Sequence, residues 1–399
     1  MNNLWQKTWR HWRQERRLPG RLANSAWVVF PEYLAFRVRK WLYALFPGSP
    51  PACLVVFPIA RIRYRFHLLY LLSLAYPKIV VFWDAGLPEL CHLQTEGRYL
   101  FRLRRVRFAS SAAFDRISRR LARFDLVRAA GSPEAAPART TRLFEIDTDL
   151  SRAPAPHSYL IPYCPHPQNF GIPLAARKQN HSRRVRVFFS GNVGFVKDPE
   201  LVRQRFRIPS RDSTTAHLRR TFPQALWLET PAQRAKWRRD RARHRLVFAT
   251  AKGDPRDWLH ELGDADFFLC LPGSHMPMCH NAIEAMMAGA IPILAYADWF
   301  SPHLRNGIEC LTYRSLDELD EAIERAVQMD EDSVRTMQLH VRAYHDRFLD
   351  LDAVSRKIFG PQNPRRHQRL YLNQEDCDNL SAAGPDSVRL NGGALQQEL

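Results

Sequence analysis

One segment, residues 266–294, holds most of the side chains in this sequence that could do chemistry. It reads DFFLCLPGSHMPMCHNAIEAMMAGAIPIL. The pattern predicts a buried strand, a Pro-Gly-Ser loop, a helix capped by His280 or Asn281 and running to Met287, and a second strand. The first N–H groups of a helix have no partner within it, so its amino end attracts anions, and phosphate most often. Glu284, one turn into the helix, can reach ribose hydroxyls beyond the phosphates. The segment therefore predicts a nucleotide-binding site.

The loop before this helix is the best candidate for a diphosphate cradle. We expect the backbone around Ser274, His275 and the stretch from Cys279 through His280 to Asn281 to line it. His280 and Asn281 can equally be N-cap residues, and Glu284 can equally be a solvated carboxylate stabilised by the helix dipole.

A second wall of the site is predicted where the strand pattern VRVFFS at 185–190 ends in a glycine turn. Its members are Gly191, Asn192 and Gly194, although the glycines can equally serve an ordinary tight turn. Lys252, just after the strand pattern at 246–250, can add a contact to a phosphate or a base.

Alternating strand and helix patterns must position these residues in both halves of the chain. In the first half we expect strands at 54–59, 78–83, 99–101, 125–127 and 143–146, with helices at 61–76 and 111–124. In the second half we expect strands at 185–190 and 246–250 and helices at 232–243, 316–329 and 333–350, with the segment 258–262 before the opening segment and 310–313 after it. This alternation predicts an α/β protein with two Rossmann-like domains.

Shifts in composition suggest where the domains end. We expect a basic-aromatic segment at 1–25, a first domain at 26–178, a second at 179–350 and a tail at 351–399 that is largely disordered after 360. A proline-dense stretch, APAPHSYLIPYCPHP at 153–167, is expected to join the domains and to return a short strand, 159–161, to the first.

The net charge of +19 and the pI near 10.1 imply anionic partners. Nucleic acid is disfavoured, because the basic residues are dispersed and no recognised binding module appears. Seven cysteines, an odd number without a CxxC pair, suit a reducing compartment. No signal peptide or membrane span is recognisable, so we expect a cytoplasmic protein. Trp5, Trp9 and Trp12, interleaved with arginines, can lie on an anionic membrane surface or pack on the first domain.

Two motifs together resemble those of a known family. FFSGN, beginning at Phe188, and FFLCLPGS, beginning at Phe267 and followed by NAIEAMMAGAIPIL, are similar to motifs of exostosin-like glycosyltransferases. That resemblance covers about residues 185–330, and the first half matches in architecture alone. It implies the GT-B fold, two Rossmann-like domains facing across a cleft. It also implies transfer of a sugar from a nucleotide-sugar to a glycan or lipid-linked acceptor, in cell-surface polysaccharide synthesis.

One departure from related enzymes bears on the mechanism. Many retaining GT-B enzymes carry a second glutamate eight residues before the ribose one, and here that position is Met276. This favours an inverting transfer, without a metal and with no cofactor beyond the nucleotide-sugar. Asp147-Thr148-Asp149 matches the Asp-x-Asp pattern that binds manganese in single-domain sugar transferases. The proline-rich loop after it, and the phosphate site already predicted elsewhere, favour a capping role for these acidic residues.

Inversion needs a general base for the acceptor hydroxyl. Asp84 follows the strand pattern KIVVFW, at a strand's carboxyl end where open sheets place their ligands. His166, in the proline-dense stretch, competes with it, and Glu89 is a third choice. Asp84 can equally be a turn-former and His166 a packed loop residue. Two other classes remain open: a basic nucleic-acid-binding protein and a non-catalytic glycan-binding relative.

Overall fold

The computed structural model describes two units of the chain, Met1–Glu145 with Arg365–His367, and Ile146–Pro364 with Gln368–Leu399. The boundary runs through two strands, β5 (Thr140–Asp147) and β13 (His367–Leu372). Within these units the residues described are 38, 50–56, 62–84, 103–147, 158–171, 183–191, 193, 206–240, 242–273, 277–363 and 365–372. For residues 62–65 this covers the backbone alone.

The first unit is built on a parallel sheet. Its further elements are β1 (Cys53–Val56), α3 (Ile62–Ala75), β2 (Ile79–Phe82), β3 (Val106–Ala109), η2 (Ser111–Ala113), α6 (Phe114–Arg120) and β4 (Phe124–Ala129). β1 pairs in parallel with β2 and β4, and β2 pairs in parallel with β3. Leu54 and Val80 are fully buried in a core that also contains Phe124 and Leu126. The apolar runs therefore form strands because both faces of a parallel sheet are covered.

The sequence-based elements of this unit are largely confirmed. The helix expected at 111–124 is shorter, because a 3-10 turn precedes α6 and Phe124 already begins β4. The strand expected at 99–101 lies outside the described residues, as does the segment 1–25.

The second unit contains a six-stranded sheet of order β12-β11-β10-β7-β9-β8, in which every pair is parallel. Its elements are β7 (Val185–Ser190), α8 (Arg211–Thr221), β8 (Leu226–Leu228), α9 (Pro231–Arg239), β9 (His244–Ala249), α10 (Trp258–Gly263), β10 (Ala265–Cys270), α11 (His280–Met287), β11 (Ile291–Leu294), η5 (Ala297–Trp299), β12 (Leu311–Thr312), α12 (Leu316–Gln328), α13 (Glu331–Phe348) and α14 (Leu351–Phe359).

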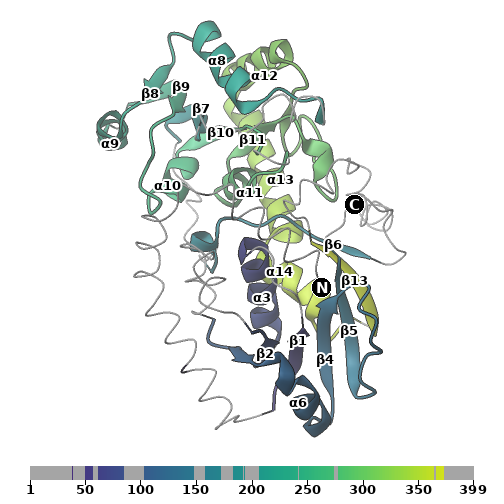
Figure 1. Ribbon diagram of the computed structural model, residues 1–399. Coiled ribbons are helices and arrows are strands. Elements are labelled where there is room, and N and C mark those ends of the chain that lie inside the picture. The colour runs from purple at the N-terminus through teal and green to yellow at the C-terminus, as the bar shows by residue number, and fades with distance from the viewer. Residues whose placement is uncertain are drawn as a thin grey trace. The chain divides into compact units, whose positions relative to one another are not determined.

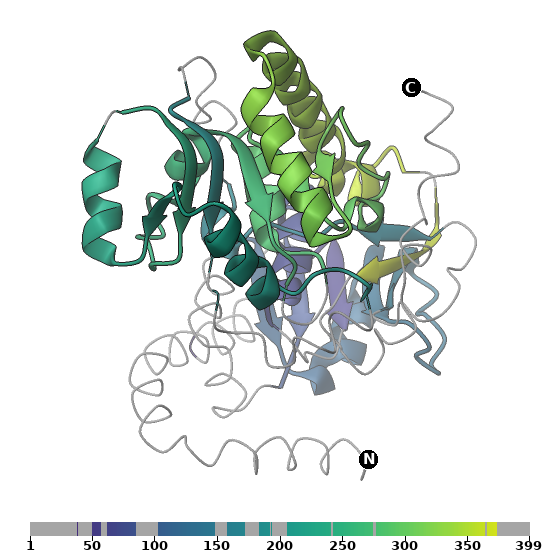
Figure 2. The same cartoon turned by 90° about the horizontal axis from the view of Figure 1, so that it is seen from above.

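Helices cover this second sheet. α10 and α11 pack on the central strand β10, whereas α12 packs on β7 and on α8, as Figure 1 shows. Figure 2 shows the two long helices α12 and α13 next to each other. All six residues of β10 are buried, which explains the apolar run from Phe267 to Cys270. Asp266, the charged residue of this strand, is paired with Arg186 (3.1 Å). The α/β fold class, with two Rossmann-like parallel sheets, is confirmed.

The described part of the tail expected after residue 350 contains one helix and one strand, α14 and β13. α14 follows α13 directly, and β13 pairs in parallel with β6 (Tyr159–Ile161). The seven-stranded sheet thus has the order β3-β2-β1-β4-β5-β13-β6. The expectation of disorder after 360 is therefore wrong for β13. Leu370, Tyr371 and Leu372 are buried there, and this short apolar run was obscured by the polar residues on both sides of it.

Among the described residues, no helix is long and apolar enough to cross a membrane.

Candidate functional site

The site is built on the loop between β10 and α11, as the sequence predicts. The N-cap residue of α11 is Cys279, with extended backbone (φ −134°, ψ 143°), so the expectation of a cap at His280 or Asn281 is wrong. Both residues lie in the first turn of the helix, which leads into β11 through Gly289. Gly289 has a φ of +72°, a conformation that favours glycine. Ser274, His275 and Met276, in the loop itself, lie outside the described residues.

Arg211, the first residue of α8, points its guanidinium at the same end of the sheet. Its Nε donates to the carbonyl of Pro272 (3.2 Å), and Nη2 lies 3.4 Å from the carbonyl oxygen of Leu271. A Cβ atom on Gly191, which follows β7, would lie 3.6 Å from Nη1. A cation therefore lies where β7 and β10 both end. Sequence reasoning missed Arg211, because no motif surrounds it and α8 itself was not expected.

Cys279 carries a thiol of unusual acidity. Its Sγ lies 3.9 Å from Arg211 Nη2 and 4.0 Å from His280 Nδ1. Burial alone would raise the pKa of Cys279, but the charges of His280 and Arg211, together with hydrogen bonds, lower it to about 6. The thiol is thus largely a thiolate at neutral pH. By contrast, burial raises the pKa of Cys270 well above its ordinary value.

Glu284 is fully buried on α11 and is bonded to three donors. Its Oε1 accepts hydrogen bonds from the backbone N–H of His166 (2.7 Å) and from Asn169 Nδ2 (2.8 Å). Its Oε2 accepts one from Trp258 Nε1 (2.5 Å). The ribose contact expected of this carboxylate stays a prediction. Asn169 and Trp258 were not expected near it, since they are 115 and 26 residues away in sequence.

His166 lies beside the amino end of α11. It is the N-cap of a 3-10 turn, η3 (Pro167–Asn169), and its Nδ1 accepts a hydrogen bond from the backbone N–H of Gln168 (3.3 Å). Its ring lies edge-on to that of His280, with the ring centroids 5.8 Å apart. The structure therefore brings together His166, Arg211, Cys279, His280 and Glu284 at one end of the second sheet.

The other predicted residues have simpler surroundings. Asp84 is exposed after β2 of the first unit, and its Oδ2 accepts a hydrogen bond from the backbone N–H of Ser111 (2.8 Å) at the start of η2. Lys252 is exposed just after β9. Asn281 is half-buried in the first turn of α11. Three further candidates, Glu89, Asn192 and Gly194, lie outside the described residues.

No group of three or more His, Cys, Asp or Glu residues that could hold a metal occurs in the part of the chain that the structure describes. Asp147, at the end of β5, forms an ion pair with Arg369 (3.9 Å). Thr148 and Asp149, the rest of the Asp-x-Asp pattern, lie outside the described residues.

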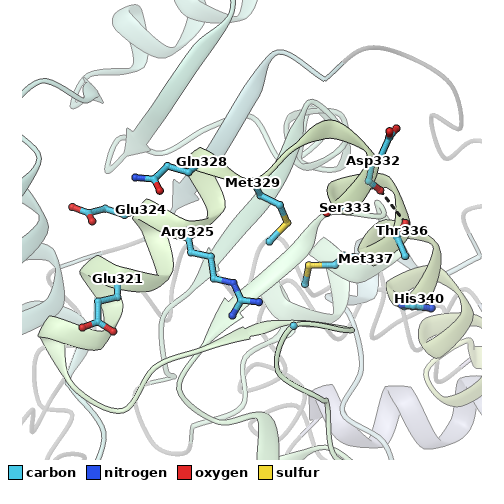
Figure 3. Close-up of a pocket in the computed structure, with 11 residues that line it drawn as sticks. Glu321, Glu324, Arg325, Gln328, Met329, Asp332, Ser333, Thr336, Met337 and His340 are labelled. Atoms are coloured by element: carbon cyan, nitrogen blue, oxygen red, sulfur yellow. Dashed lines mark hydrogen bonds between the residues drawn. The ribbon is translucent and has the colours of Figure 1, made fainter.

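A separate groove of about 810 Å³ lies between α12 and α13 (Figure 3). Its lining includes three acidic residues, Glu321 and Glu324 on α12 and Asp332 on α13, together with Arg325. None of the residues gathered at α11 belongs to it. The groove is therefore distinct from the candidate site.

Comparison with known proteins finds solved structures that resemble this chain remotely, and no match by sequence. No protein-family model matches the sequence, and no curated protein matches it. The solved structure of Anabaena HepE in complex with UDP is 12% identical, and the alignment covers 77% of this chain and 98% of that one, with a TM-score of 0.40. AviGT4, a glycosyltransferase involved in avilamycin A biosynthesis, is 13% identical; the alignment covers 76% of this chain and 95% of that one, with a TM-score of 0.30. The trehalose-6-phosphate synthase OtsA is 14% identical, with coverages of 73% and 74% and a TM-score of 0.29. At such values, the geometry of the site itself must carry any functional conclusion.

Proposed function

We propose that the protein is a glycosyltransferase that moves a sugar from a nucleotide-sugar donor to a glycan or lipid-linked acceptor. The observation that carries this proposal is the convergence of Arg211 with the amino end of α11 where β7 and β10 end. Open parallel sheets bind their ligands at the carboxyl ends of their strands. A guanidinium and the first N–H groups of a helix form a site suited to a diphosphate.

The same groups suit the chemistry of the transfer. The leaving nucleotide carries away negative charge, and preorganised donors that neutralise it lower the barrier. Arg211 and the backbone around His280 and Asn281 would do this without help from a metal ion. Ser274 and His275 would complete the cradle, with Gly191, Asn192 and Gly194 on its other wall. Lys252 would reach a phosphate or the base.

We assign the acceptor chemistry to the first unit, as the GT-B arrangement implies. Asp84 is the preferred base of an inverting transfer, because its carboxylate is exposed directly after β2. The basic-aromatic segment 1–25 would attract the protein to an anionic membrane surface, where a lipid-linked acceptor resides.

A thermal-shift screen against UDP-, GDP-, CMP- and dTDP-sugars tests the proposal. A donor present at about one hundred times its dissociation constant should add about 2.7 kcal/mol to the free energy of unfolding. Release of free nucleotide on addition of an acceptor glycan would then show turnover. No stabilisation by any donor would contradict the proposal, and binding without turnover would indicate a non-catalytic relative. Salt-steep binding to generic DNA, with no response to donors, would indicate a nucleic-acid-binding protein.

A further inference from the structure

Glu284 is a buried carboxylate that is held by uncharged groups. Its three donors among the described residues are a backbone N–H, a side-chain amide and an indole N–H, and its side chain is 0% exposed. A carboxylate buried away from water is costly unless its oxygens are well satisfied. Glu261, a buried glutamate of α10, is instead paired with the guanidinium of Arg234. The buried charge of Glu261 is therefore balanced by a cation, whereas that of Glu284 is stabilised by hydrogen bonds from neutral groups.

The donors of Glu284 come from two segments that α11 must hold in place. Both bonds to Oε1 come from residues 162–171, called here the His166 loop, and the bond to Oε2 comes from α10. An ionised carboxylate oxygen accepts about two hydrogen bonds, so Oε1 is already saturated. The carboxylate is thus arranged to bind its own chain.

The loop that Glu284 holds fixes the state of the His166 ring. Since Nδ1 accepts a hydrogen bond from the N–H of Gln168, the neutral ring carries its proton on Nε2. In this state the ring donates through Nε2. The ring lies edge-on to His280, the first residue of α11.

We infer that Glu284 is a positioning residue: it clamps the His166 loop to α11 and holds His166 as a hydrogen-bond donor beside the candidate phosphate site. The clamp itself stands on the geometry of the second unit alone. Its catalytic value, stabilisation of charge on the departing phosphate, rests on the proposed function. The inference also separates the two base candidates, because a ring held with its proton on Nε2 is a donor, which leaves the base role to Asp84.

Hydrogen–deuterium exchange on the unliganded protein tests the clamp without any ligand. In Glu284→Gln the new amide N–H₂ opposes the indole N–H of Trp258, and the charge that holds the loop is lost. Exchange of peptides covering 158–171 should rise about tenfold or more, since the protection of the loop backbone falls with the clamp. Glu309→Gln is the matched control. Glu309 is 4% exposed and is bonded to Arg305, so its loss should leave these peptides unchanged.

Unchanged exchange of 158–171 in folded Glu284→Gln would overturn the clamp. Should that variant not fold, Asn169→Ala and Trp258→Phe each remove one donor. Asn169→Ala should speed exchange in the loop, and Trp258→Phe should do so in α10. If neither variant changes the exchange of its segment, the clamp is overturned as well.

UDP binding and turnover separate a clamp from a direct ribose contact. A clamp predicts that Glu284→Gln lowers kcat about tenfold or more and leaves the dissociation constant of UDP within about twofold. A ribose contact predicts UDP binding weakened about tenfold, together with loss of the preference for UDP over 2′,3′-dideoxy-UDP. The exchange result stands even if UDP does not bind, so failure of the proposed function and failure of the clamp can be told apart.

Discussion

The two parallel sheets end in different chemistry. At the carboxyl end of the second sheet, Arg211, Cys279 and His280 gather around the amino end of α11. In the described part of the first sheet, β2 ends at Phe82 and is followed by Trp83 and the exposed carboxylate of Asp84. The strands are alike in direction and in burial. The two sheets differ in the residues that follow their strands. In the second sheet these residues suit binding of an anion, and in the first sheet one of them, Asp84, can itself accept a proton.

Replacing Asp84 should give the largest effect. If Asp84 is the base, Asp84→Asn lowers turnover at saturating donor by about 10²–10⁴-fold, because the acceptor proton has no recipient. Donor affinity should not change, since we propose that the donor binds in the second unit. Asp115→Asn, also an exposed carboxylate of the first unit, serves as the control.

His166→Ala belongs in the same experiment. A loss of this size in His166→Ala, with Asp84→Asn fully active, would transfer the base role to His166. Full activity in Asp84→Asn would rule out a base on the first sheet, and full activity in both variants would rule out both base candidates.

Replacing Arg211 should give the next effect. Arg211→Ala is expected to weaken nucleotide binding about 10–100-fold, because hydrogen bonds to a charged partner contribute about 1.5–3 kcal/mol. Isothermal titration with the donor found in the screen measures this. The matched control is Arg256→Ala, since Arg256 is exposed and paired with Asp254 (2.6 Å). Equal losses in both variants would show a non-specific effect of charge.

The sequence predicted the elements of the site better than its contacts. The strand, loop and helix around 266–294 followed from periodicity, because a buried parallel strand and a short helix leave clear patterns. Glu284 was singled out, yet its partners Asn169 and Trp258 were not, because tertiary contacts over 115 and 26 residues leave no local signal. β13 was missed for a related reason. It is defined by pairing with β6 rather than by its own composition.

Cys279 offers a chemical probe of the second sheet. With a pKa of about 6, its alkylation by iodoacetamide should reach half of its maximal rate near pH 6 and level off above about pH 7, whereas that of an ordinary thiol continues to rise toward pH 9. At pH 7 the rate should exceed that of an ordinary thiol about fourfold, because its larger thiolate fraction is offset by weaker nucleophilicity. A bound diphosphate should raise this pKa and slow the reaction. Mass spectrometry of the modified peptide measures the rate, with Cys279→Ser as the control. A rate that still rises at pH 9 would refute the lowered pKa of Cys279.

Lys252 should have the smallest effect. It is exposed after β9, so any phosphate contact is screened by water. Lys252→Ala is expected to weaken donor binding about two- to fivefold in the same titration, and less at high salt. A loss as large as that of Arg211→Ala would mean that the donor lies nearer β9 than α11.

The most direct test is a map of hydrogen–deuterium exchange with and without the nucleotide-sugar that stabilises the protein. We expect protection at the carboxyl end of the second sheet, in peptides covering 206–215 and 268–287, and none in peptides covering 79–84 and 106–115 until an acceptor is added. Protection of the first-sheet peptides by the donor, with the α11 peptides unchanged, would contradict the assignment of the donor to the second sheet.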